Sequence, residues 1–279
     1  MGQPQLKEKP ERASQPATDV AAASEPARPR SPRPAALSRA GWAVLAGVIL
    51  ALNIPIIHRA LRGAQPITAT VPYSDDFSDP STISRNYWTT GGHWRVVSGE
   101  LLAPGVKNNP LWLQARLPRD VAVEFDARSE SPEGDLKVEI FGDGLNHASG
   151  YILIHGGWNN RISVIARLDE HGTSLEELRR RAQRLASAKG LPNADLVQTG
   201  AFRSGTHMRV EASPYPVQPG KTYRWRIERR GSLLRWLIDG QPFMELDDPF
   251  PLEGKGHDRF GFSAWEAQLY FDNLRIAPL

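Results

Sequence analysis

The chain has 279 residues and a mass of 30.9 kDa, with 40% hydrophobic residues, 23% charged residues and a mean hydropathy of −0.42. This balance excludes a polytopic transporter and allows one sizeable hydrophobic core. The absence of cysteine excludes disulfides, lipoprotein thiolation, cysteine zinc sites and thiol catalysis. The net charge is +3, but residues 73–279 hold 25 basic and 27 acidic residues, so no nucleic-acid partner is indicated for that part.

The N-terminal segment, residues 1–40, is dominated by Pro, Ala, Ser and charged residues. It lacks the aliphatic and aromatic side chains that would offset the entropy of ordering a backbone. We predict a disordered Pro/Ala-rich tail, which is also a candidate binding segment for a cytoplasmic partner.

A charge-free stretch follows at residues 41–57, with the sequence GWAVLAGVILALNIPII. As a helix it would be about 25 Å long, near the lower limit for crossing a bilayer, so it predicts a single transmembrane helix. The alternative is a cleaved secretory signal, which requires small residues at positions −3 and −1. Cleavage after Ala64 would place Arg62 at −3, and cleavage after Ala69 would place Ile67 there, so neither site fits.

Arginines flank this stretch unequally, and the bias predicts a single-pass membrane protein with a cytoplasmic N-terminus and an extracytoplasmic C-terminal domain. Four precede it and two follow it, namely Arg28, Arg30, Arg33 and Arg39, then Arg59 and Arg62. Residues 58–72 are predicted to form a linker.

The remaining residues, 73–279, alternate in short segments bounded by Gly, Pro, Asn and Asp, which is typical of an antiparallel β-sandwich or barrel. Segments 121–126 and 136–140 are each predicted to have one dry and one wet face, which places Lys137 and Glu139 in solvent. Residues 223–227, 234–238 and 241–246 predict a three-stranded meander, and two more strands are expected at 260–265 and 269–276.

One segment has helical spacing instead. Ser174 and Glu177 form a capping box, and Gly190 followed by Pro192 ends the pattern. The sequence therefore predicts an inserted surface helix at about residues 175–189, whose arginine-rich face we interpret as solvated.

Four phrases resemble the concanavalin A-like lectin/glucanase superfamily, in particular its laminin-G-like and 3-keto-disaccharide hydrolase-like bacterial domains. They are DDFSDPSTISRNYWTTGGHWRVVSGELLAP (75–104), VAVEFDAR (121–128), PGKTYRWRIERRGSLLRWLIDGQPF (219–243) and FDNLRI (271–276). The resemblance covers nearly all of residues 73–279 and implies a mainly β, two-sheet antiparallel jelly roll with a concave face that binds sugar in many members. The fold hosts lectins, hydrolases and lyases alike.

The same resemblance implies a structural calcium ion between the first and last strands. Asp76 and Asp272 would supply part of its oxygen ligands. The alternative is that these aspartates cap turns and bind backbone amides. No other cofactor is indicated.

Catalytic residues are not predicted. Laminarinase-type glucanases space their acids as E-x-D-x-E or E-x-D-x-x-E, whereas Glu124, Asp126 and Glu130 have one residue more. The seven histidines contain no HExxH pair, and no G-x-S-x-G elbow is present.

A turn-rich segment, residues 150–161, is the predicted ligand-binding site, because an aromatic ring beside amides and a guanidinium suits a sugar. Its candidates are His155, Trp158, Asn159, Asn160 and Arg161. Three further candidates come from other turns or strand ends and are expected to lie near this segment, namely His147, Trp265 and Glu266. The alternative is a tight turn at Asn159 and Asn160 with Trp158 buried beneath it.

Charged side chains on the strands, such as those of Arg224, Arg226 and Glu228, would form either a ligand groove or a wet face with cross-strand ion pairs. Together these observations predict a membrane-anchored, extracytoplasmic module of the cell envelope that binds carbohydrate or another surface ligand without catalysis. The alternatives are a glycan-active hydrolase or lyase, and a structural or assembly protein of the envelope.

Overall fold

The computed structural model describes residues 37–61, 65–212 and 214–279. The described residues up to Arg59 belong to one compact unit, and those from Ala60 onward form a second. The predicted tail lies outside the described residues as far as residue 36. Helix α1 (Arg39–Leu61) contains the whole of the charge-free stretch and extends four residues into the predicted linker. In the part of the chain that the structure describes, no helix has both the length and the apolar character needed to cross a membrane, so the predicted transmembrane segment is not supported.

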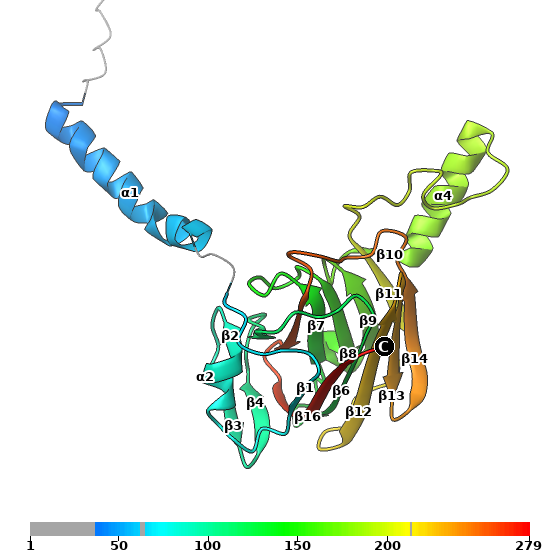
Figure 1. The fold of residues 1–279 in the computed structure, drawn as a ribbon. Helices are drawn as coiled ribbons and strands as arrows, with labels where there is room; N and C mark the ends of the chain where they lie inside the picture. The colour runs from blue at the N-terminus through cyan, green and yellow to red at the C-terminus, as the bar shows by residue number, and fades with distance from the viewer. Residues whose placement is uncertain (1–36, 62–64, 213) are drawn as a thin grey trace, which may run out of the picture. The chain divides into compact units, whose positions relative to one another are not determined.

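Two eight-stranded sheets form a β-sandwich in the second unit (Figure 1), which confirms the predicted mainly-β, two-sheet architecture. Sheet A has the order β14-β13-β12-β6-β16-β4-β3, with β1 also paired to β16. Its strands are β14 (Gln241–Asp247), β13 (Leu233–Ile238), β12 (Thr222–Arg230), β6 (Val121–Ser129), β16 (Gln268–Pro278), β4 (Glu100–Pro104), β3 (Arg95–Val97) and β1 (Tyr73–Asp75).

Sheet B has the order β10-β11-β9-β8-β7-β15-β5-β2. Its strands are β10 (Thr173–Ser174), β11 (Met208–Ala212), β9 (Ile162–Arg167), β8 (Tyr151–Gly156), β7 (Leu136–Gly142), β15 (Arg259–Ser263), β5 (Leu111–Leu113) and β2 (Tyr87–Thr89). The pairing of β10 with β11 is parallel, which departs from the fully antiparallel prediction.

Alternating side chains of the two sheets build the core between them. Phe125 on β6 lies 5.3 Å from Trp225 on β12, and Trp225 lies 4.3 Å from Trp236 on β13, measured between ring centroids. The opposite side chains of β6 and β12 are partly exposed, as their alternation predicts. The predicted meander is confirmed as β12, β13 and β14, and the two further strands as β15 and β16.

Three short or inserted helices belong to the same unit, α2 (Thr82–Asn86), α3 (Gly157–Asn160) and α4 (Leu175–Lys189). Helix α4 projects from one end of the sandwich beside β10 (Figure 1). The Ser174 hydroxyl accepts a hydrogen bond from the Glu177 amide, and Gly190 ends the helix in the left-handed conformation. The predicted insertion at 175–189 therefore forms with the predicted caps.

A buried ion pair fixes the 248–252 segment to sheet B. The Arg167 Nε atom donates to Asp248 at 2.7 Å, and both side chains are about 1% exposed. The Tyr151 hydroxyl donates to the same carboxylate oxygen at 2.7 Å, and the Phe250 amide donates to the other oxygen. The guanidinium also donates to the carbonyls of Thr206 and Phe250, so each of its three nitrogens makes a hydrogen bond.

The outer face of sheet A carries cross-strand ion pairs. Arg224 on β12 binds both Glu124 and Asp126 on β6 at 3.1 Å, and Arg226 also binds Glu124. These side chains are roughly one-third exposed. The sequence allowed either a ligand groove or a solvent-exposed face with cross-strand ion pairs. The structure shows the second of these on sheet A.

Candidate functional site

The outer face of sheet B is covered, in contrast to that of sheet A. Lys137 and Glu139 point to this face and are 1% and 0% exposed. The prediction that they face solvent is wrong, because loops cover β7: Asn108, His147 and Glu170 lie over it and contact these two side chains. A small apolar cluster continues across the same face on β8 and β9, consisting of Ile152, Ile154, Val164 and Ala166.

A pocket with a volume of about 790 Å³ opens over this face. Its walls combine two tryptophan rings with amide and carboxylate side chains. The lining includes Trp158, Trp265, Asn108, Asn159, Glu133, Asp135, Lys137, Glu170, His171, Glu266 and the apolar Ile154. A cavity of this size fits a ligand of a few hundred daltons.

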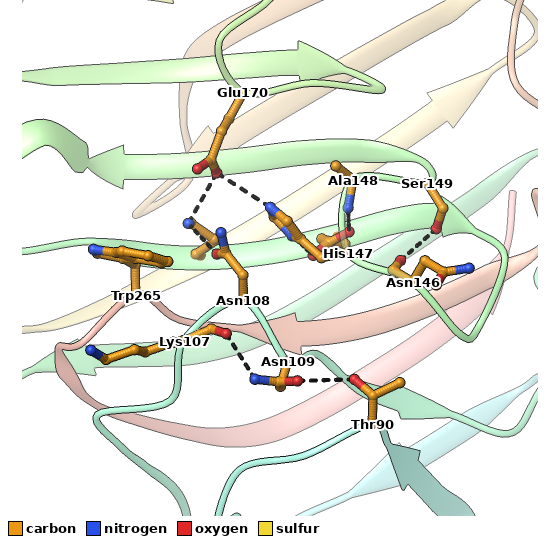
Figure 2. A network of polar contacts seen from close by, with 12 residues as sticks. Thr90, Lys107, Asn108, Asn109, Asn146, His147, Ala148, Ser149, Glu170 and Trp265 are labelled. Atoms are coloured by element: carbon orange, nitrogen blue, oxygen red, sulfur yellow. Dashed lines mark hydrogen bonds and ion pairs between the residues drawn. The ribbon is translucent and has the colours of Figure 1, made fainter. Parts of the chain in front are cut away.

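Lys137 organises the floor of the pocket. Its ammonium group donates to the Asn108 side-chain oxygen and to Glu170, both at 3.1 Å, and lies 4.0 Å from Asp135. Asn108 and Glu170, which approach each other from two different loops in Figure 2, both accept a hydrogen bond from this lysine. A buried ammonium is stable only when it is paired and hydrogen-bonded, so Lys137 ties both loops to β7.

A histidine joins this floor to a second buried carboxylate. The His147 Nδ1 atom lies 2.6 Å from Glu139. Its Nε2 atom lies 3.8 Å from Glu170, the contact that Figure 2 shows between these two residues. The other Glu139 oxygen accepts a hydrogen bond from the Ala148 amide. Glu139 is thereby satisfied although it is fully buried, and the 143–149 loop is held against β7.

Asp135 positions one of the two tryptophans. Its Oδ2 atom accepts a hydrogen bond from the Trp265 backbone amide at 2.8 Å. Burial raises the pKa of the Asp135 carboxyl to about 6, with nearby Lys137 opposing the shift. This carboxyl therefore exchanges its proton near neutral pH inside the pocket.

The raised pKa of Asp135 makes stability depend on pH. Below about pH 4 the carboxyl is protonated in both the folded and unfolded states, whereas above pH 6 folding requires a buried charge, so stability is lost as the pH rises. Between pH 4 and pH 8 the Asp135 carboxyl is expected to cost the parent protein about 3 kcal/mol in free energy of unfolding. Asp135→Asn has no such carboxyl, so its free energy of unfolding should rise by this amount relative to that of the parent. Urea denaturation of both proteins at the two pH values measures this, and parallel changes would contradict it.

Trp158 and Trp265 flank the pocket in different ways. Trp158 has a left-handed backbone (φ 52°), and its ring contacts His171 at 5.7 Å and the Arg209 guanidinium at 5.4 Å. Trp265 is 49% exposed, which is unusual for so large an apolar side chain. Two partly free indole rings in one pocket provide apolar faces on which a ligand can stack.

The structure brings together half of the predicted site residues. Trp158, Asn159, Trp265 and Glu266 line the pocket, although they come from two distant parts of the sequence. His147 lies in the polar network below it.

The other three predicted residues lie elsewhere. His155 faces the core, where it stacks on Tyr215, and burial lowers its pKa to about 4. Asn160 binds the backbone of Val217 and Pro132, as the tight-turn alternative expects. Arg161 is exposed and does not line the pocket.

Sequence reasoning misses six polar residues of the pocket lining, namely Asn108, Glu133, Asp135, Lys137, Glu170 and His171. Lys137 and Glu139 alternate along β7 and Asp135 directly precedes it, so a segment with charges on one face was visible in the sequence. That pattern is also typical of an exposed strand, and no sequence signal places the loops of Asn108 and Glu170 above it.

The calcium prediction is not supported. Among the described residues, no group of three or more His, Asp or Glu side chains lies close enough to hold a metal ion. Asp76 accepts a hydrogen bond from the Ser78 amide, and Asp272 accepts one from the Asn273 amide. Both aspartates therefore cap turns, as the alternative interpretation expects.

Fold and site together define a two-sheet β-sandwich with an acidic, tryptophan-flanked pocket on one sheet face. No protein-family model matches the chain, and no curated protein matches it either. Solved structures with a similar fold include the carbohydrate-binding module CBM66 from Bacillus subtilis, at 15% identity and a TM-score of 0.48, over 69% of this chain and 95% of that one.

Two further structures are similar at the same level. A Bacillus subtilis protein of unknown function with a galectin-like fold has 13% identity and a TM-score of 0.43, over 74% of this chain and 94% of that one. The Crh5 transglycosylase in complex with NAG has 11% identity and a TM-score of 0.46, over 77% and 86%. At these values the likeness carries no inference about a ligand, which has to come from the pocket itself.

Proposed function

We propose that the protein binds carbohydrate in the pocket between Trp158 and Trp265. The observation that carries this proposal is the combination of two accessible indole rings with a polar floor in a single cavity. A sugar ring has apolar C–H faces that stack on indole, while its equatorial hydroxyls need hydrogen-bond partners at the edge. Asn159 and Asn108 provide amides for those hydroxyls, and Ile154 adds an apolar surface beside Lys137.

The floor is also preorganised. Lys137 holds two loops in place, and Asp135 holds the backbone of Trp265. A site whose walls are already fixed loses little conformational entropy when a ligand binds. This supports binding by a rigid platform, without a closing lid.

A glycan array tests the proposal with the full-length protein. The parent protein is expected to bind a defined set of oligosaccharides, and Trp158→Ala should lose those signals while keeping the parent thermal stability. Binding that is indifferent to Trp158 and Trp265 would place the ligand elsewhere and overturn the assignment.

Glycan hydrolysis is the second candidate function, because two of the carboxylates that line the pocket, Asp135 and Glu170, lie close to Lys137 at its floor. Asp135, with its pKa of about 6, suits a general acid near neutral pH, and Glu170 is a second carboxylate beside it. The discriminating experiment is reducing-end release from bound oligosaccharides. Turnover abolished by both Asp135→Asn and Glu170→Gln would favour a hydrolase, whereas binding without turnover would favour a lectin.

We also propose that the β-sandwich lies outside the cytoplasm, on the basis of the arginine excess before the charge-free stretch. Alkaline phosphatase fused after Leu279 is expected to be active in a bacterial host, because that reporter folds only in an oxidising compartment. If a reporter that fluoresces only in the cytoplasm were active at the same position and the phosphatase were inactive, the β-sandwich would lie in the cytoplasm and this proposal would be wrong.

A further inference from the structure

We propose that the pocket selects amino sugars carrying a free ammonium group, and that it discriminates against uronic acids. The inference rests on the proposed carbohydrate binding and adds the chemical class of the ligand. It follows from the charges that line the same cavity.

Acidic side chains outnumber basic ones in the pocket wall. Four carboxylates line it, those of Glu133, Asp135, Glu170 and Glu266, together with a single ammonium, that of Lys137. An excess of negative charge inside a partly enclosed, low-dielectric cavity attracts a cationic ligand group and repels an anionic one.

The cations near the pocket are already engaged. Lys137 is 1% exposed, and its ammonium group donates hydrogen bonds to Asn108 and Glu170. Lys107, just outside, is paired with Glu266. A uronate carboxylate would therefore meet no unpaired ammonium or guanidinium group on the pocket wall.

Of the four carboxylates, that of Glu133 can bind an incoming ammonium group most directly. It is exposed at the pocket wall, and no ion pair to it is formed within the described ranges 37–61, 65–212 and 214–279. An ammonium placed there would gain a charge-assisted hydrogen bond without displacing an existing partner.

Calorimetric titration of the full-length protein at pH 7 and low ionic strength tests the inference. The probes are tetrasaccharides of glucosamine, of N-acetylglucosamine and of galacturonic acid. The glucosamine tetramer is expected to bind at least about tenfold more tightly than the N-acetylated tetramer, and the uronate should show no binding. Raising the salt concentration should weaken the glucosamine complex selectively.

Charge-neutral variants connect this preference to the pocket. Glu133→Gln is expected to reduce severalfold the ratio of the affinity for the glucosamine tetramer to that for the N-acetylated tetramer. Glu245→Gln is the matched control, because Glu245 is an exposed, ion-paired glutamate on β14 of the other sheet. It should leave both affinities unchanged.

The outcomes separate the inference from the function on which it rests. Equal or tighter binding of the N-acetylated or uronate tetramer, lost in Trp265→Ala, would overturn the amino-sugar inference and leave carbohydrate binding standing. Absence of binding by all three tetramers would also overturn the inference, and the glycan array would then decide on carbohydrate binding separately.

Discussion

Replacing Asp248 with alanine is expected to lower the free energy of unfolding by about 3–5 kcal/mol. The change leaves the Arg167 guanidinium buried without its counter-ion and removes the acceptor of the Tyr151 hydroxyl. Both partners are almost fully buried, so water cannot replace the lost contacts. Urea denaturation followed by tryptophan fluorescence measures the effect.

Asp247→Ala is the matched control for that experiment. Asp247 is the preceding residue and is exposed at the end of β14, so its loss is expected to change stability by less than about 0.5 kcal/mol. If the two variants were equally stable, the buried ion pair would not hold the 248–252 segment to sheet B as described.

Replacing Trp265 with alanine is expected to weaken oligosaccharide binding by at least about tenfold, or about 1.4 kcal/mol. The indole ring is half exposed in the free protein, so its removal takes away a stacking surface and disturbs little packing. The thermal midpoint should therefore stay close to that of the parent protein. Calorimetric titration with the best oligosaccharide from the glycan array provides the measurement.

Trp42→Ala serves as the control for the loss of an exposed tryptophan. Trp42 lies in α1 and is 59% exposed, but it does not line the pocket. Its replacement should leave the affinity unchanged. An unchanged affinity in Trp265→Ala as well would remove Trp265 from the binding site.

The strands of sheet A could be predicted because one face of each is buried and the other is exposed to solvent. In β12 and β13, buried and exposed side chains alternate as the sequence does, and Gly231 and Gly240 mark the turns between strands. The caps of α4 were predictable for a similar reason, since Ser174 and Gly190 act on their nearest neighbours in the chain.

The central strands of sheet B follow a different rule. Strand β8 is buried along its whole length, so no alternation shows that His155 points to the core while Ile154 points to the pocket. In β7 the alternation exists, but distant loops determine whether Lys137 lies in water. The aromatic residues of the pocket could be named from local turn chemistry, whereas its charged floor depends on contacts that span the sequence.

The most direct test of the pocket is a nuclear magnetic resonance titration of the full-length, ¹⁵N-labelled protein with the glucosamine tetrasaccharide, monitored at the indole N–H groups. The chain has eight tryptophans, and single Trp→Phe variants assign their signals. The indole resonances of Trp158 and Trp265 are predicted to shift in a saturable manner, while those of the core residues Trp225 and Trp236 stay in place. Saturable shifts confined to backbone amides on the outer face of sheet A, with both pocket indoles unchanged, would contradict the account.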